Sequence, residues 1–340
     1  MDAYLHSERQ CDSERMRSPA PVRPVYAALD LGTNNCRLLI ARPTLSGFRV
    51  IDAFSRIVRL GEGVFSSERL SDSAMERTLA ALKVCGAKIQ RRGVTAVRAV
   101  ATEACRRAHN CAPFLEAVED ETGIAIEIIS SEEEGRLAIA GCAALLDANV
   151  PHALVFDIGG GSTELMWLAL RPGEQPRLLD QISMRCGVIG LSERYGGDRF
   201  TLDSYHAMVD EVASHIEPFA ERNGIREHLE RGGVQMLGTS GTVTTLAGVH
   251  LGLARYDRRA VDGSFLRVEH ARDIIRRLVA LDFEGRSRHA CIGTERADLV
   301  VAGCAVLEAI CDCCPVERLR IADRGLREGI LVDLIGAAQG

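Results

Sequence analysis

The stretch VFDIGGGSTEL, residues 155–165, decides the fold, because it places three consecutive glycines between two strand-like runs. Glycine adopts positive φ without a steric penalty and lets backbone N–H groups approach a ligand closely. The backbone donors that this turn offers to phosphate oxygens are the N–H groups of Gly159, Gly160, Gly161, Ser162 and Thr163. A hydrogen bond to a charged acceptor contributes roughly 1.5 to 3 kcal/mol. Several such bonds together predict a polyphosphate cradle that needs no lysine.

Two acids flank this turn, since Asp157 precedes the glycines and Glu164 follows them. Both carboxylates would repel a phosphate unless a cation lay between them. Mg²⁺ accepts carboxylate and phosphate oxygens together and retains water ligands. We therefore predict a Mg²⁺ site in which Asp157 and Glu164 are ligands.

A similar unit occurs earlier in the chain. VYAALDLGTNNCRLLIARP, residues 25–43, is predicted as a strand, a polar turn and a second strand. The same order returns in residues 153–170, where Asp157 holds the place of Asp30. Asp30 is thus a third candidate ligand for the same ion. A single glycine turn is often an ordinary hairpin, but its repetition indicates two related domains that face each other.

A third glycine-rich turn lies in LGTSGTVTTLAG, residues 237–248, directly before a predicted helix. The N-terminus of a helix presents free N–H groups and a positive dipole end to an anion. Ser240, Gly241 and Thr242 are therefore candidate phosphate ligands, although a simple helix cap explains the same residues nearly as well. None of these turns is a P-loop or a dinucleotide turn, because the chain has no Gly-Lys pair and no GxGxxG.

The rest of the chain alternates strands with helices, which predicts α/β architecture with largely parallel sheets covered by helices. Residues 71–90 are predicted as a helix with a capping box of Ser73 and Glu76. The segment 126–146 is predicted to turn from strand to helix at an acidic run, and its small residues permit close helix packing. With 340 residues, two domains are expected.

Composition excludes several partners. The net charge of −6 gives no overall positive field for nucleic acid or a membrane. The aromatic residues form no stripe interleaved with basic ones, so no single-stranded nucleic acid is expected. The twelve cysteines lack paired spacings, so CDCC at 311–314 is interpreted as buried thiols, and no histidine is assigned to metal. Residues 1–24 are predicted to be a disordered tail without a secretory signal, and hence the protein to be cytoplasmic.

Six motifs in fixed order resemble the exopolyphosphatase / guanosine pentaphosphate phosphohydrolase (Ppx/GppA) family. They are DLGTNN, ATEACRRAHN, IEIISSEEEGRLAIAG, FDIGGGSTEL, LGTSGTVTTLAG and IADRGLREGILVDLI, spread from about residue 25 to the end. The resemblance implies the actin-like, sugar-kinase-like ATPase fold, with two ribonuclease-H-like domains around a phosphate cleft. It implies a first domain of residues 25–132 plus about 322–340 and a second of 133–321. It also makes a homodimer an expectation.

The resemblance assigns roles to individual residues. It places the second phosphate turn at 157–164 and adds Arg106 as a phosphate-contacting arginine. The first phosphate turn consists of Asp30, Gly32, Thr33 and Asn34, followed by Asn35 where the family commonly has serine. That exchange retains a hydrogen-bonding side chain.

The resemblance also assigns the catalytic glutamate to Glu134. A carboxylate at a strand-to-helix junction can position and deprotonate a water for attack on a terminal phosphorus. From the residues alone, the run Glu132, Glu133 and Glu134 is more simply the solvated first turn of a helix, favoured by its dipole. Glu133 is the alternative base if the register differs by one.

The leading functional hypothesis is Mg²⁺-dependent release of orthophosphate from the end of inorganic polyphosphate. Removal of the 5′ terminal phosphate of guanosine pentaphosphate (pppGpp) is the alternative within the family. An ATP-dependent phosphotransferase of the same fold and a non-catalytic polyphosphate or alarmone sensor are further alternatives. Longer relatives carry an HD-like C-terminal domain that this sequence is expected to lack, so processivity on long chains is not assigned.

Overall fold

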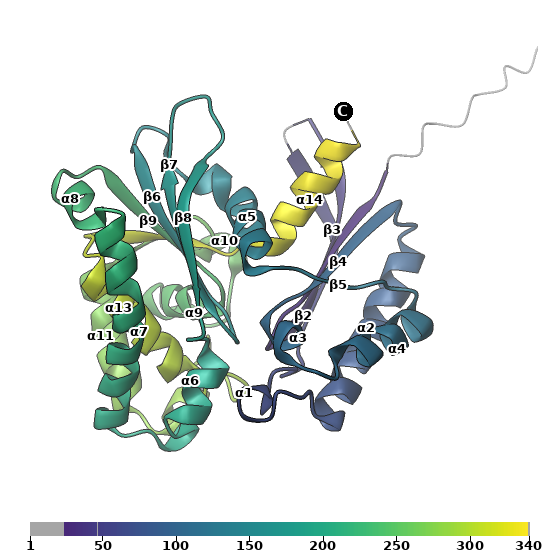
Figure 1. The fold of residues 1–340 in the computed structure, drawn as a ribbon, viewed down its shortest axis with the longest axis horizontal. Coiled ribbons are helices and arrows are strands. Elements are labelled where there is room, and N and C mark those ends of the chain that lie inside the picture. The colour runs from purple at the N-terminus through teal and green to yellow at the C-terminus, as the bar shows by residue number, and fades with distance from the viewer. Residues whose placement is uncertain (1–23, 46, 339–340) are drawn as a thin grey trace, which may run out of the picture.

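The computed structural model describes residues 24–45 and 47–338 (Figure 1). The predicted disordered tail therefore lies outside the described residues, apart from residue 24. Two mixed sheets, each covered by helices, make up two halves of the molecule. Within the described ranges no helix combines the length and the apolar character needed to cross a membrane.

The first sheet has five strands in the order β3-β2-β1-β4-β5. Their bounds are β1 Tyr26–Leu31, β2 Asn35–Thr44, β3 Gly47–Ile57, β4 Ala96–Ala101 and β5 Glu127–Ile128. β1, β2 and β3 are antiparallel neighbours, whereas β4 pairs parallel with β1 and β5 parallel with β4. The helices that follow these strands are α1 Val64–Ser67, α2 Asp72–Arg91, α3 Glu103–Arg107 and α4 Cys111–Thr122. One face of β1 packs with α2 and α4 in a common apolar cluster.

The second sheet has six strands in the order β10-β11-β9-β6-β7-β8. Their bounds are β6 His152–Ile158, β7 Thr163–Ala169, β8 Arg177–Met184, β9 Val234–Thr239, β10 Phe265–Arg267 and β11 Arg318–Ala322. Its helices are α6 Val188–Arg194, α7 Leu202–Arg222, α8 Ile225–Glu230, α9 Gly241–His250, α10 Arg258–Val261, α11 Val268–Ala280, α12 Phe283–Ser287 and α13 Val300–Cys313. The apolar side chains of α7, α9, α11 and α13 join those of β6 and β9 in the largest core cluster.

The internal repetition seen in the sequence is confirmed by the topology. β6, β7 and β8 form the same antiparallel meander as β1, β2 and β3, and β9 pairs parallel with β6 as β4 does with β1. The two phosphate turns are closed by equivalent bonds: Gly32 N–H donates to the Asn35 carbonyl and Gly159 N–H to the Ser162 carbonyl, both at 2.9 Å. The duplicated unit thus builds the same turn twice.

Two helices lie between the sheets, α5 Ser131–Cys142 and α14 Leu326–Ala337 (Figure 1). α14 packs on the face of β1 opposite to α2, where it shares an apolar cluster with α5. The two helices approach so closely that a Cβ on Gly329 would lie 2.0 Å from the Leu137 carbonyl oxygen, and one on Gly141 2.0 Å from that of Gly325. The small residues predicted to permit close packing do so here.

Two local predictions have different outcomes. The helix expected at 71–90 spans Asp72–Arg91, but its N-cap is Ser71, whose hydroxyl accepts from the Ala74 N–H, so the capping box of Ser73 is wrong. The thiols of CDCC are buried, as expected: Cys311, Cys313 and Cys314 are free and almost fully enclosed.

Candidate active site

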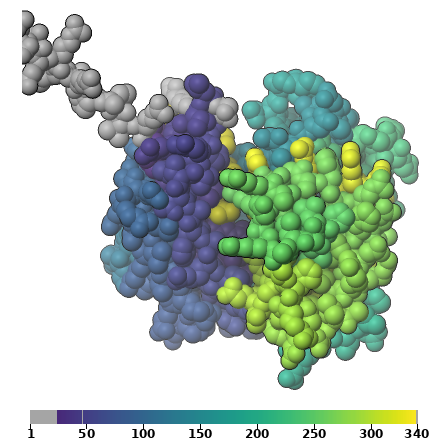
Figure 2. Space-filling view, turned by 180° about the vertical axis from the view of Figure 1, so that it is seen from behind, coloured from purple at the N-terminus to yellow at the C-terminus, as the bar shows by residue number. Residues whose placement is uncertain are grey.

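A cavity of about 940 Å³ lies between the two halves and is lined by residues from both. In the space-filling view the seam between the purple-blue first half and the green-yellow second half is visible (Figure 2). All three glycine turns reach this cavity. The lining residues from the turns are Gly32, Thr33, Asn34, Asn35, Gly159, Gly160, Gly161, Ser162, Ser240 and Gly241.

The first and second turns touch each other across the seam. A Cβ on Gly160 would lie 3.2 Å from the Cβ of Thr33, and one on Gly161 would lie 2.6 Å from the Thr33 hydroxyl oxygen. Since a separation of 2.6 Å is too short for a real Cβ contact, the second turn needs glycine at Gly161 to face the first. The two sets of N–H groups therefore border one cavity.

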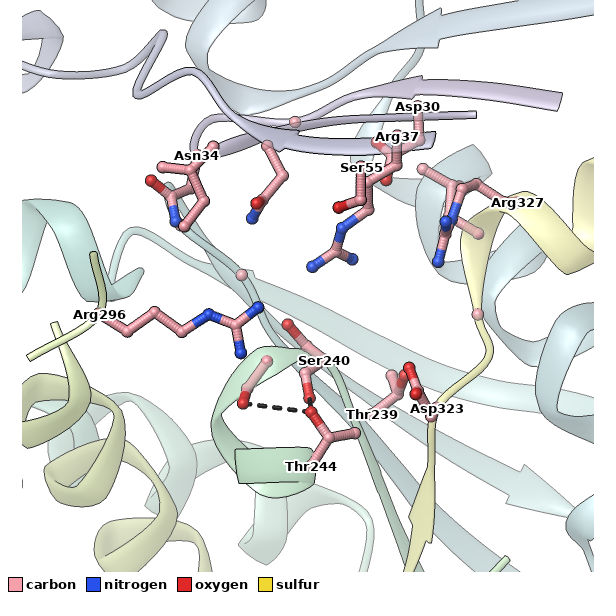
Figure 3. Close-up of a pocket in the computed structure, with 18 of the residues that line it drawn as sticks. Asp30, Asn34, Arg37, Ser55, Thr239, Ser240, Thr244, Arg296, Asp323 and Arg327 are labelled. Atoms are coloured by element: carbon pink, nitrogen blue, oxygen red, sulfur yellow. Dashed lines mark hydrogen bonds between the residues drawn. The ribbon is translucent and has the colours of Figure 1, made fainter. Parts of the chain in front are cut away.

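The third turn is hydrogen-bonded to the strand that leads into the second turn, and its backbone is strained. Ser240 adopts φ 85° with ψ 179°, a conformation that is essentially restricted to glycine. Its hydroxyl donates to the Ile158 carbonyl at 2.7 Å. The Thr244 hydroxyl donates to the Ser240 carbonyl at 2.9 Å (Figure 3). These bonds hold the strained residue at the N-terminus of α9, beside the glycines.

Four carboxylates gather around the turns. Asp30, Asp157 and Glu134 line the cavity, whereas Glu164 lies directly behind, opposite Asp157 in the register of β6 and β7. Burial raises the pKa of Asp30, and burial together with Asp30 raises that of Asp157 to about 6. Burial and the Asp157 charge raise the pKa of Glu164 to about 7. The cluster therefore resists full ionisation in the absence of a cation.

Of the acidic run at the start of α5, only Glu134 lines the cavity. Its side chain is 16% exposed and accepts from Arg106 at 2.9 Å. Burial and the charge of Glu164 raise its pKa well above the usual value, against the opposing effect of Arg106. Glu133 instead points away from the cavity and forms salt bridges with Arg136 at 2.7 Å and with Arg98 at 2.9 Å.

The remaining predicted residues do not line the cavity. The Arg106 guanidinium contacts Glu103, Glu134 and the Ile129 carbonyl, so it positions Glu134 in this structure. The Thr163 hydroxyl donates to the Cys186 carbonyl at 2.9 Å and is turned into the protein. Thr242 lines a smaller neighbouring cavity of about 60 Å³.

Six arginines that sequence reasoning missed line the cavity, namely Arg37, Arg56, Arg258, Arg296, Arg324 and Arg327. Arg258 and Arg324 form salt bridges with acids, whereas, in the described part of the chain, Arg37, Arg296 and Arg327 are three that do not. Their guanidinium groups extend into it from different elements, as Figure 3 shows. Among the described residues, none of the three pairs with a carboxylate within salt-bridge distance. Burial and repulsion by Arg37 lower the pKa of Arg296 and Arg327. These arginines are partly buried and repel one another. An extended anion bound between them would compensate their charges and so stabilise this arrangement.

The carboxylates fit a Mg²⁺ ion. Asp30 and Asp157 offer hard oxygen ligands from the two halves of the molecule, and both line the cavity. Neither forms a salt bridge with any residue that the structure describes, and burial raises the pKa of both. Buried carboxylates that form no salt bridge are expected to bind a metal or a proton. The Glu164 carboxylate accepts a hydrogen bond from the Ser183 hydroxyl at 2.7 Å. From its place behind Asp157 it would add negative charge near the ion.

The duplicated sheets, the interdomain cleft and the paired glycine turns define a protein of the actin-like, sugar-kinase-like ATPase superfamily with two ribonuclease-H-like domains. A family model described as "Ppx/GppA phosphatase family" matches residues 39–338. The chain therefore belongs to the Ppx/GppA phosphatase family, as the six motifs predicted.

Individual relatives agree with this assignment. The chain is 30% identical over 316 residues to a guanosine-5′-triphosphate,3′-diphosphate pyrophosphatase of Photobacterium profundum, covering 93% of this chain and 60% of that protein. It thus spans less than two thirds of the length of the curated relatives it matches. Among solved structures, the Ppx/GppA family member of Aquifex aeolicus is 28% identical with a TM-score of 0.75, covering 93% and 99% of the two chains. An exopolyphosphatase-like protein is 28% identical with a TM-score of 0.83, covering 93% and 99%.

Proposed function

We propose that the protein is a Mg²⁺-dependent phosphohydrolase that releases the 5′ terminal phosphate of guanosine pentaphosphate. The observation that carries this proposal is one cavity bordered by the three glycine turns, by Glu134 and by arginines that have no carboxylate partner among the described residues, Arg37, Arg296 and Arg327 included. The names of the curated relatives favour this substrate over inorganic polyphosphate, which is the leading hypothesis from the sequence. Polyphosphate stays the second candidate, because one of the similar structures is named an exopolyphosphatase-like protein.

The proposed reaction begins with a water held by Glu134. The carboxylate accepts a proton from this water as the oxygen attacks the terminal phosphorus. The bond from that phosphorus to the bridging oxygen breaks, and its electron pair leaves with guanosine tetraphosphate, so orthophosphate is the second product. The N–H groups of Asn34 and Gly160 would donate to the non-bridging oxygens, where charge accumulates, whereas those of Gly32 and Gly159 already donate within their turns.

Each neighbouring group has a separate role in this proposal. Arg106 holds the Glu134 carboxylate in one orientation through a bond of 2.9 Å. Asp30 and Asp157 would hold Mg²⁺, which when bound neutralises charge on the phosphate oxygens. Arg37, Arg296 and Arg327 would bind the phosphates more distant from the reacting one, because guanidinium groups bind phosphate in a bidentate manner.

The test is a phosphate-release assay with Mg²⁺ over guanosine pentaphosphate, polyphosphates of defined length, and ATP. The proposal predicts the highest kcat/KM on guanosine pentaphosphate. Faster release from polyphosphate would favour the second candidate. Phosphate transfer from ATP to an acceptor, without hydrolysis of guanosine pentaphosphate or polyphosphate, would identify a phosphotransferase. Tight binding of these compounds without turnover would identify a sensor.

A further inference from the structure

A second cluster of metal-ligating side chains lies outside the cleft. Cys186, Glu211 and His215 each offer one ligand atom, and these atoms all lie within 4.8 Å of one another. None of the three lines the cavity described above. Glu211 and His215 are four positions apart on α7, so they share one helix face. Cys186 faces them from the segment that joins β8 to α6.

One oxygen of Glu211, Oε1, faces the thiol and also accepts a hydrogen bond from Arg194. The Tyr195 hydroxyl donates to Glu211 Oε2 at 2.7 Å, while the Cys186 Sγ lies 3.8 Å from Oε1. Carboxylates that bind metals commonly have such a hydrogen bond at their other oxygen. Ligand atoms around a tetrahedral Zn²⁺ lie about 3.3 to 3.8 Å apart, as follows from bonds of about 2.0 to 2.3 Å. Small rotations of the exposed His215 side chain would therefore bring the three ligand atoms to the separations that a tetrahedral Zn²⁺ site requires.

The charges also fit a divalent cation. A Cys186 thiolate and the Glu211 carboxylate together balance two positive charges, and a neutral imidazole adds none. Arg194 pairs with Glu211 in the structure, and its side chain is 40% exposed. The cation and Arg194 would compete for the same carboxylate.

We propose that Cys186, Glu211 and His215 bind a thiophilic divalent cation of the Zn²⁺ class, with water as the fourth ligand. Binding releases the thiol proton to solvent. The site is separate from the Mg²⁺ ligands in chemistry as well as in place, because sulfur and imidazole ligands select softer metals than carboxylates do.

The backbone around Cys186 braces the second glycine turn. Its carbonyl accepts from the Thr163 hydroxyl at 2.9 Å, and the next residues, Val188 and Ile189, donate to the carbonyls of Gly159 and Gly160 at 3.0 and 2.9 Å. A cation at Cys186 would therefore fix the segment on which this turn rests.

Titration of the full chain with Co²⁺ tests the site, because tetrahedral Co²⁺ absorbs in the visible range and a bound thiolate adds a charge-transfer band in the near ultraviolet. We expect one equivalent with both signals, displaced by Zn²⁺. Cys186→Ser should remove the charge-transfer band. His215→Gln, at an exposed position that does not threaten folding, should weaken Co²⁺ binding at least about tenfold.

Matched variants separate this site from the other thiols and histidines. Cys313→Ser removes another buried thiol, and His206→Gln removes an exposed histidine of the same helix, so both should leave the titration unchanged. Arg194→Gln should tighten Co²⁺ binding, since it removes the competing cation from Glu211. Absence of a thiolate band in the natural protein, or its persistence in Cys186→Ser, would overturn the proposal. Weakening in Cys313→Ser equal to that in Cys186→Ser would overturn it as well.

Discussion

Arg37 and Glu164 occupy the same register position in the two halves of the molecule. Arg37 lies opposite Asp30 across β1 and β2, and Glu164 lies opposite Asp157 across β6 and β7. The duplicated unit thus places a cation beside one acid and a second carboxyl group beside the other. Burial raises the pKa of both aspartates and Arg37 partly offsets this rise, whereas the Asp157 charge adds to the burial that raises the pKa of Glu164. Arg37 thus gives an anion-binding group to the wall of the cleft that the first half contributes (the anion-binding wall), whereas Glu164 adds a carboxyl group behind the wall that the second half contributes.

The first prediction concerns the anion-binding wall. Arg37→Gln should weaken binding of guanosine pentaphosphate by about 10- to 100-fold, because one charge-assisted hydrogen bond is lost. The change in affinity would be measured by calorimetric titration of the protein with the substrate, with Ca²⁺ in place of Mg²⁺. Arg42→Gln is the matched control, since Arg42 lies on the same strand but is exposed and does not line the cavity. Equal affinities of the Arg37 and Arg42 variants would contradict the role given to Arg37.

The second prediction concerns the packing that supports the second turn. A Cβ on Gly187 would lie 2.3 Å from the Gly161 carbonyl carbon and 2.5 Å from the Gly160 carbonyl oxygen. Gly187→Ala should therefore lower the free energy of unfolding by about 1 to 3 kcal/mol and also weaken phosphate binding. Denaturant unfolding is the measurement. Gly336→Ala, where nothing lies within 4 Å of the new Cβ, should be neutral or stabilise α14 by up to about 1 kcal/mol.

The third prediction concerns pH. Burial raises the pKa of Asp157 from 3.8 to about 6 and that of Glu164 from 4.5 to about 7. The folded protein therefore binds more protons than the unfolded chain between about pH 4 and pH 7. The stability that these groups contribute is fully present below about pH 4 and is lost as the pH rises through about 6 and 7. We expect the free energy of unfolding of the metal-free protein to fall over this range.

Mg²⁺ should reverse that loss, because it binds the ionised carboxylates. Its addition should raise the melting temperature more at about pH 8 than at about pH 5, as thermal unfolding with and without a chelator would measure. In Asp157→Asn the Mg²⁺-dependent increase at the higher pH should largely disappear. An equal effect of Mg²⁺ on the Asp157 variant and the natural protein would show that the ion stabilises the fold from another place.

The glycine turns and their acids were predictable from the sequence, whereas the arginines were not. Consecutive glycines beside a carboxylate leave a local pattern, and its repetition at Asp30 and Asp157 indicated a shared cleft. Arg296 and Arg327 come from distant segments and meet Arg37 only in the folded chain. Arg37 and Arg327 did lie within recognised motifs, but nothing local distinguishes them from surface arginines.

Strand register and helix periodicity explain why some of the predicted site residues do not reach the cavity. Thr163 is already the first residue of β7, paired with Ile158, so its hydroxyl turns toward the Cys186 carbonyl. Glu133 and Glu134 are adjacent on a helix and hence point about 100° apart, which directs only one of them into the cleft. The sequence left these two glutamates as alternatives, and the helix orientation distinguishes them.

The most direct test of the account is phosphate release from guanosine pentaphosphate by Glu134→Gln in the presence of Mg²⁺. We expect turnover to fall by about 100- to 10,000-fold while substrate affinity stays within a few fold, because the glutamine amide keeps the shape of the side chain but accepts no proton. Glu133→Gln, which loses only its pairs with Arg98 and Arg136, should retain turnover. Unchanged turnover in the Glu134 variant, or its loss in the Glu133 variant alone, would contradict the account.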